Sequence, residues 1–254
     1  MTFPTFAPDD PRGRLAFPLD VPDLDRALRL TELLSGSAGW FKIGLELFVA
    51  LGPEAVGRVR DLAPDCGIFL DLKLHDIPAT VAGAMRRAAA LGAGLVTVHG
   101  QGGPEMLRAA AASAGAARVL AVTVLTSLDP AALPELAPAC RAPGALAALL
   151  ARRALESSCH GLVCSPEETA ALRALAGPAA LIVVPGIRPA WARVAADDQT
   201  RVGTPARAIA DGADLLVVGR PIRDAVDPRK AASLVLEEIA AALAARRSPG
   251  PAGR

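Results

Sequence analysis

Short apolar runs alternate with longer segments rich in alanine, leucine and arginine along most of the 254 residues. Apolar runs of about four to eight residues predict buried strands, and longer segments with apolar residues at helical spacing predict helices. Repeated units of this kind build parallel sheets that are covered by helices. The expected strands are Leu15–Asp20, Trp40–Gly44, Ile68–Leu74, Leu95–His99, Val119–Leu125, Gly161–Cys164, Leu181–Pro185 and Leu215–Gly219.

Eight strands with helices between them favour a closed (β/α)8 barrel, or TIM barrel, which typically takes about 250 residues. An open, doubly wound sheet is the alternative. It is disfavoured because no glycine-rich dinucleotide fingerprint follows the first strand and no P-loop motif occurs in the sequence. We therefore predict one α/β domain, a single (β/α)8 barrel over residues 1–254. Residues 1–12 and 248–254 are expected to be loosely ordered.

Local signals mark the ends of several helices. Pro78 follows the third strand, and the pair Asp227-Pro228 precedes the last helical segment. The run 165–168, Ser-Pro-Glu-Glu, combines an N-cap residue, a first-turn proline and first-turn acids. Gly92 and Gly212 are placed where C-terminal caps occur.

The charge balance points to a small-molecule partner. The formal net charge is +1, with 27 basic and 26 acidic residues, so no broad basic surface for nucleic acid or an anionic membrane is expected. No signal peptide and no membrane-spanning run is evident, which predicts a soluble, cytoplasmic protein. The four cysteines lack the spacing of a metal site or a disulfide scaffold.

Lysine is rare in this chain. Of the 27 basic residues only Lys42, Lys73 and Lys230 are lysines. An ammonium group gives up and recovers a proton, whereas a guanidinium group stays protonated. Because Lys42 and Lys73 fall inside predicted strands, we interpret them as chemical rather than solvating groups.

Charged residues gather near the ends of the predicted strands, where the active sites of such barrels lie. Asp20 ends the first strand, Lys42 lies in the second, and Asp71 and Lys73 lie in the third. Burying each charge alone is costly, so we expect these side chains to pair around a ligand. Strand alternation places Asp71 and Lys73 on one face, ~7 Å apart along the chain.

An ammonium flanked by carboxylates stays protonated and suits the delivery of a proton to a carbon with developing negative charge. The alternative is a purely structural role, in which these charged residues form a layer of ion pairs inside the barrel and only neutralise one another. The three histidines are too few for a convincing metal site, and His75 and His99 are expected to support the site or the fold.

The run from Asp71 to Pro78, Asp-Leu-Lys-Leu-His-Asp-Ile-Pro, resembles the signature of the orotidine 5′-monophosphate decarboxylases. The resemblance extends over nearly the whole chain. Further matching segments are Leu19-Asp20, Phe41-Lys42-Ile43-Gly44, Val98-His99, the run from Ala121 to Ser127, Val163-Cys164-Ser165, the run from Pro185 to Pro189, and the run from Val218 to Ile222.

This resemblance implies a cofactor-free and metal-free enzyme that decarboxylates orotidine 5′-monophosphate to uridine 5′-monophosphate in de novo pyrimidine biosynthesis. Lys73 would protonate C6 of the base. The implied catalytic network is Lys42, Asp71, Lys73 and Asp76. The implied substrate contacts are Asp20 and Lys42 at the ribose, Asp71, Thr126 and Ser127 at the base, Pro185 along the pocket, and Arg188, Gln199, Gly219 and Arg220 at the phosphate.

The resemblance also implies a homodimer in which Asp76 and Thr80 reach into the neighbouring subunit's site. Residues 191–204 are the candidate for a loop that closes over the phosphate. The implied phosphate contacts follow the seventh and eighth predicted strands, and loops at these positions are the usual phosphate site of such barrels.

Three other functions stay open. Magnesium-dependent sugar-phosphate decarboxylases and synthases of the same superfamily resemble this chain less well. A Schiff-base aldolase would use Lys73 with a lowered pKa, which flanking aspartates oppose. A non-catalytic barrel that binds a phosphate ligand is the third, because a fold does not fix a function.

Overall fold

A computed structural model describes residues 6–7, 9–128, 130–138, 140, 142–192 and 201–247. Within this part of the chain, eight parallel strands close into a barrel in sequence order, and the last strand pairs with the first. The predicted (β/α)8 barrel is confirmed. The strands are β1 (Leu15–Pro18), β2 (Trp40–Gly44), β3 (Gly67–Leu74), β4 (Leu95–His99), β5 (Arg118–Val122), β6 (Gly161–Val163), β7 (Leu181–Val184) and β8 (Leu215–Val217).

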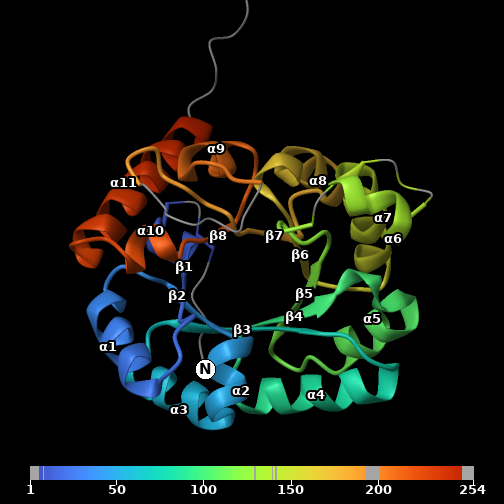
Figure 1. The fold of residues 1–254 in the computed structure, drawn as a ribbon, viewed down its shortest axis with the longest axis horizontal. Coiled ribbons are helices and arrows are strands. Elements are labelled where there is room, and N and C mark those ends of the chain that lie inside the picture. The colour runs from blue at the N-terminus through green and yellow to red at the C-terminus, as the bar shows by residue number, and fades with distance from the viewer. Residues whose placement is uncertain are drawn as a thin grey trace, which may run out of the picture.

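The helices form a ring around the strands (Figure 1). The α-helices are α1 (Leu24–Leu34), α2 (Leu45–Leu51), α3 (Pro53–Leu62), α4 (Pro78–Ala90), α5 (Gly103–Ala112), α6 (Leu133–Leu136), α7 (Pro143–Glu156), α8 (Thr169–Ala176), α9 (Pro205–Ala210), α10 (Arg220–Arg223) and α11 (Pro228–Arg247). Short 3-10 helices are η1 (Arg12–Arg14), η2 (Gly100–Gly102), η3 (Pro130–Ala132) and η4 (Pro166–Glu168). Among the helices described, none is both long and apolar enough to cross a membrane.

The predicted helix boundaries are confirmed. Helix α4 begins at Pro78, and α11 begins at Pro228 after Asp227, whose side chain accepts a hydrogen bond from the Lys230 amide at 3.0 Å. Gly92 and Gly212 follow helices with φ of 85° and 105°, a backbone conformation that glycine adopts without steric cost.

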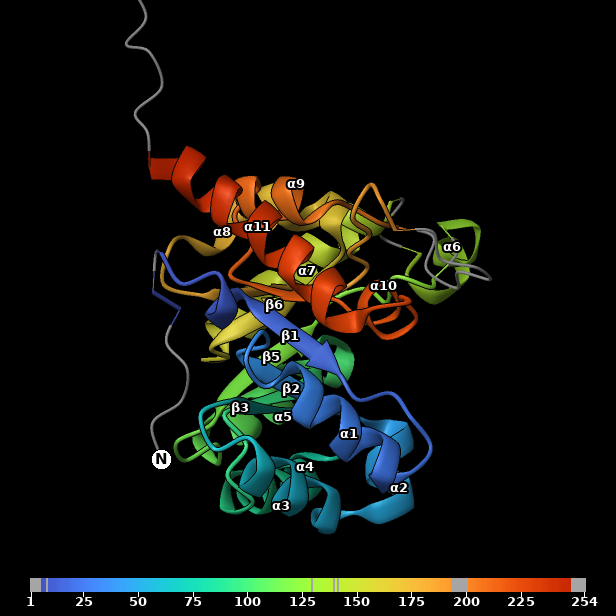
Figure 2. The same ribbon diagram turned by 90° about the vertical axis from the view of Figure 1, so that its left-hand side faces the viewer.

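Several predicted strands extend too far at their carboxyl ends. The strand expected to run to Leu125 ends at Val122, because its neighbour β6 spans only Gly161–Val163 and offers no further partner. The strand expected to run to Asp20 ends at Pro18. The residues beyond each strand end belong to the loops at that end of the barrel. In Figure 2 the β1 arrow points toward this end, where α6 and α10 lie.

Apolar side chains fill the barrel interior and a second layer between strands and helices. Trp40, Phe69 and Leu120 belong to the interior cluster. Phe6 lies in the stretch for which we expected loose order, yet its ring stacks on Trp40 with centroids 5.7 Å apart. The amino-terminal end of the barrel is therefore covered by an aromatic side chain.

An ion-pair network joins neighbouring β/α units at the amino-terminal end of the barrel. The Asp214 carboxylate, which precedes β8, accepts hydrogen bonds from Arg173, from Arg14 at 3.2 Å and from the Ile182 amide at 2.9 Å. Only 20% of the Asp214 side chain is exposed. Residues at the amino-terminal end of a (β/α)8 barrel contribute to stability rather than to catalysis.

Replacing Asp214 with asparagine should lower the free energy of unfolding by about 3 kcal/mol, because two guanidinium groups lose their carboxylate partner. Asp211→Asn is the matched control. Asp211 pairs with Arg207, whose side chain is largely exposed, so its loss should cost at most about 1 kcal/mol. Chemical denaturation of both variants measures the difference. Equal destabilisation would show that the Asp214 network does not stabilise the barrel.

Candidate active site

A cavity of about 440 Å³ opens at the carboxyl ends of the strands. This is the end of the barrel at which (β/α)8 enzymes hold their substrates. It is lined by Pro18, Asp20, Lys42, Phe69, Asp71, Lys73, Val122, Val124, Leu125, Thr126, Val163, Cys164, Pro185, Gly186, Arg188, Val217, Gly219, Arg220 and Arg223.

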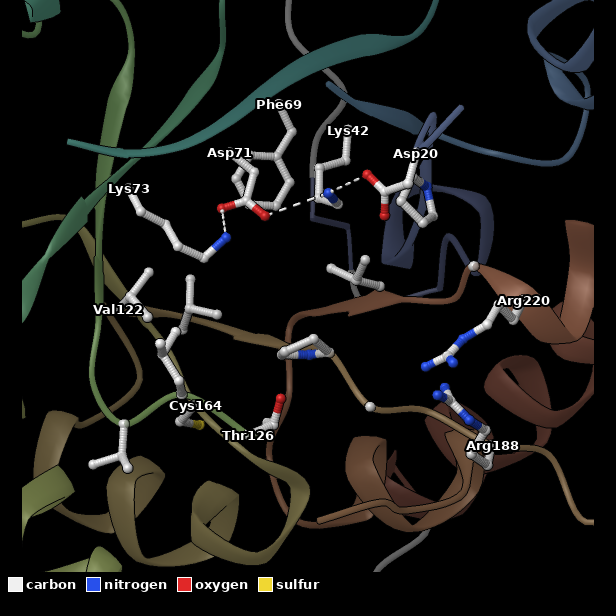
Figure 3. Close-up of a pocket in the computed structure, with 18 of the residues that line it drawn as sticks. Asp20, Lys42, Phe69, Asp71, Lys73, Val122, Thr126, Cys164, Arg188 and Arg220 are labelled. Atoms are coloured by element: carbon white, nitrogen blue, oxygen red, sulfur yellow. Dashed lines mark hydrogen bonds and ion pairs between the residues drawn. The ribbon is translucent and has the colours of Figure 1, made fainter. Parts of the chain in front are cut away.

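Four charged side chains of alternating sign form a row along one wall (Figure 3). Lys42 Nζ lies 3.0 Å from Asp20 Oδ1 and 3.4 Å from Asp71 Oδ2. Lys73 Nζ lies 2.9 Å from Asp71 Oδ1. Gly44 leaves room for the row, because a Cβ atom there would lie 2.9 Å from Asp20 Oδ1 and 3.1 Å from Lys42 Nζ. The convergence predicted from the strand ends is present.

The row keeps its central members charged. Burial by itself would lower the pKa of Lys42, but Asp71 and Asp20 outweigh it and raise that pKa above its usual value. Burial would likewise raise the pKa of Asp71, but Lys42 and Lys73 outweigh it and lower that pKa. A fixed carboxylate therefore lies between two ammonium groups.

The backbone around Lys73 differs from the regular alternation that we predicted. Leu70 pairs with Val96 and Leu74 with Val98, so four steps along β3 face only two along β4. Lys73 has a φ of 48°, in the left-handed region, which costs roughly 1–2 kcal/mol for a residue other than glycine. Asp71 and Lys73 meet because of this bulge, not because of regular pleating. Backbone strain of this kind is typical of functional sites.

Thr97 on β4 holds the bulge, and the sequence interpretation missed it. Its Oγ1 atom accepts a hydrogen bond from the Lys73 amide and donates one to Asp71 Oδ1, both at 2.9 Å. Thr97 is completely buried. The available signal was a single hydroxyl within the apolar run Leu95–His99.

Arginine side chains supply positive charge on the opposite side of the cavity. Arg188 follows β7 and Arg220 follows β8, and Figure 3 shows their guanidinium groups facing each other. Two guanidinium groups in this arrangement suit a multivalent oxyanion. Arg223 also lines the cavity and was not predicted. It donates a hydrogen bond to the Asp20 carbonyl at 3.0 Å.

Between the two charged regions the cavity wall is mainly apolar, with Val122, Pro185 and Val217 among its members. Cys164 also lies there, and burial raises the pKa of its thiol to about 12. The thiol is therefore neutral and is no nucleophile. Thr126 adds a hydroxyl to this wall. A flat ring with one polar edge fits such a surface.

Some predicted residues lie elsewhere. Asp76 and Thr80 are exposed and do not line this cavity. Asp76 Oδ1 accepts a hydrogen bond from the Ile77 amide at 2.6 Å. Ser127 is exposed and outside the lining, and Gln199 lies outside the described residues, as does 193–200 of the expected closing loop.

The two histidines near the site contact each other. The rings of His75 and His99 have centroids 5.3 Å apart. Burial, His75 and Lys73 lower the pKa of His99. In the part of the chain that is described, no three histidine, cysteine or acidic side chains are grouped to hold a metal ion.

Comparison with known proteins gives a consistent result. The model of the orotidine 5′-phosphate decarboxylase / HUMPS family matches residues 13–235. A protein named orotidine 5′-phosphate decarboxylase from Anaeromyxobacter dehalogenans is 53% identical, over 89% of this chain and 97% of its own length. A protein of the same name from Thermobifida fusca is 48% identical, over 89% and 95%.

Solved structures agree with the sequence relatives. The crystal structure of orotidine 5′-phosphate decarboxylase from Lactobacillus acidophilus aligns with a TM-score of 0.76 at 33% identity. The alignment covers 89% of this chain and 98% of that one. The charged row and the fold that carries it therefore occur in a chain that belongs to the orotidine 5′-phosphate decarboxylase / HUMPS family.

Proposed function

We propose that this protein is a cytoplasmic enzyme of de novo pyrimidine biosynthesis, converting orotidine 5′-monophosphate to uridine 5′-monophosphate without a metal or cofactor. The observation that carries the proposal is the row of Asp20, Lys42, Asp71 and Lys73. Its ammonium group at Lys73 faces a cavity whose other side presents arginines.

The substrate fits this cavity in one direction. Its phosphate binds Arg188 and Arg220, where two guanidinium groups chelate oxygen atoms. Its ribose hydroxyls bind Asp20 and Lys42. Its ring then lies against the apolar wall and Thr126, with C6 and its carboxylate toward Lys73.

The reaction needs a proton donor next to C6 of the ring. When the C6–carboxylate bond breaks, carbon dioxide leaves and the electron pair stays on C6. The ammonium of Lys73 stabilises this charge and donates its proton to C6, which gives the C6–H bond of the product. Lys73 then recovers a proton from water. Asp71 Oδ1, 2.9 Å from Lys73 Nζ, orients the ammonium toward the cavity.

The same distance disfavours a Schiff-base aldolase. Such an enzyme needs a neutral amine at neutral pH. Lys73 Nζ is instead held in an ion pair with the Asp71 carboxylate.

The active unit is proposed to be a homodimer. Asp76 and Thr80 lie on the exposed stretch 75–80, directly after the strand that carries Lys73. Ile77 in this stretch is 66% exposed, so an apolar side chain is available there for contact with a second copy. A second copy that covers this stretch would receive Asp76 and Thr80 at its own cavity.

Turnover measured by ultraviolet absorbance, with and without excess chelator, tests the function. We expect orotidine 5′-monophosphate to be decarboxylated at the same rate in both. Loss of turnover with chelator would favour the magnesium-dependent members of the superfamily. Binding of the nucleotide without turnover would favour a phosphate-ligand binding protein.

Thr97→Val should lower kcat about 10-fold to 100-fold with a small change in KM. Valine keeps the shape but removes both hydrogen bonds, one of them to a charged group, so Lys73 and Asp71 lose their alignment. Thr97→Ser is the matched control and should keep most of kcat. Steady-state kinetics compares the two. A valine variant as active as the serine variant would show that the hydroxyl has no part in positioning Lys73.

A further inference from the structure

Arg201 is a buried cation that the proposed reaction does not use. It is 5% exposed and lies two residues before Gly203. Backbone hydrogen bonds join Gly203 to the loop after β7: its amide donates to the Gly186 carbonyl at 3.1 Å, and its carbonyl accepts from the Arg188 amide at 2.8 Å. Arg201 is therefore fixed to the loop that carries Arg188.

The guanidinium group of Arg201 reaches two other loops. Nη2 donates to the carbonyl of Leu125 at 2.8 Å and to that of Val124 at 3.3 Å. Nη1 donates to Ser165 Oγ at 3.2 Å and pairs with Glu168. Val124 and Leu125 line the cavity in the loop after β5, and Ser165 lies in the loop after β6, where it caps η4.

One planar group thus ties the loops after β5, β6 and β7 together. A lysine cannot do this, because its single nitrogen atom does not span both carbonyl groups and the carboxylate. The loop after β5 presents Thr126 to the ring, and the loop after β7 presents Arg188 to the anion. The position of the cavity wall that receives the ring therefore depends on the loop that carries Arg188.

We propose that Arg201 is a positioning residue that couples the phosphate end of the cavity to the wall that receives the base. This inference rests on the proposed function, since it assigns the two ends to the two parts of a nucleotide. Displacements of about 1 Å at a reacting group cost on the order of 100-fold in rate. Loss of the coupling should therefore reduce kcat more than it changes KM.

The competing explanation is that Arg201 only neutralises Glu168. Glu168 also accepts a hydrogen bond from the Ser165 amide at 3.1 Å, in a capping box that glutamine also satisfies. Glu168→Gln therefore removes the charge and keeps the cap. In the double variant Arg201→Met/Glu168→Gln no buried charge is left unpaired, so the barrel should fold.

The experiment compares wild type with Glu168→Gln, Arg201→Lys and the double variant. We expect all four to be folded by thermal unfolding and Glu168→Gln to keep kcat within about 3-fold. Arg201→Lys and the double variant should lose about 10-fold to 100-fold in kcat. Wild-type kcat and KM in the folded double variant would overturn the proposal, because neutralisation of Glu168 would then explain Arg201 fully.

Binding measurements separate this proposal from the proposed function. The affinity for uridine 5′-monophosphate relative to uridine reports the contribution of the phosphate. This ratio should fall about 10-fold in the double variant, since the phosphate no longer binds a loop held to the base site. If wild type binds both ligands but does not turn over orotidine 5′-monophosphate, the proposed function fails alone. An unchanged ratio would overturn the role of Arg201 whether or not the protein is an enzyme.

Discussion

Lys73→Ala should lower kcat by at least about 10⁴-fold while the protein stays folded. General acid catalysis contributes about 10²-fold to 10⁴-fold, and the loss of a preorganised charge at the reacting centre adds about 10²-fold or more. The substitution also leaves Asp71 with one cation instead of two. Ultraviolet-monitored turnover with high enzyme concentration measures the residual rate, and binding of uridine 5′-monophosphate verifies that the cavity is intact.

Two further variants make this test specific. Lys230 is exposed on α11, so Lys230→Ala removes a lysine without touching the cavity and should leave kcat unchanged. Lys73→Arg keeps a positive charge but holds its proton too tightly to donate it. It should remain at least about 10³-fold below wild type. If kcat of Lys73→Ala lies within about 10-fold of the wild-type kcat, Lys73 is not the proton donor.

The barrel itself was predictable because its determinants are local. The strand Trp40–Gly44 and the strand Leu95–His99 have the bounds that their apolar runs indicate. Strand ends were less predictable where a neighbour is short, as for β5, since a ladder needs a partner on the adjacent strand. The length of that partner is a property of the assembled sheet.

The site was predictable to the extent that its residues carry charge at strand ends. Lys42, Asp71 and Lys73 could be identified in this way. Thr97 and Arg201 could not, because they act through contacts with residues 24 and 76 positions away in the chain. Their residue types are also common in structural roles, and the bulge at Lys73 that gives Thr97 its role violates the strand periodicity from which the prediction began.

The proposed shared-site dimer predicts a second large effect, which appears when two inactive variants are mixed. In the proposed dimer each site uses Lys73 of one subunit and Asp76 of the other. Lys73→Ala and Asp76→Ala should each lose about 10²-fold or more, because each removes one member of every site. After the two are unfolded together and refolded, about half of the dimers contain one of each subunit.

Each mixed dimer has one site in which both residues are replaced and one in which both are intact. The mixture should therefore recover about a quarter of wild-type activity. Mixing Lys73→Ala with Asp71→Ala is the matched control, since Asp71 and Lys73 of one chain are in contact and every site of that mixed dimer stays defective. Recovery in the first mixture and none in the second would establish that Asp76 acts across the interface. Equal failure of both would place Asp76 outside the neighbouring site, because the exchange of subunits cannot restore a site that never contained the partner's residue.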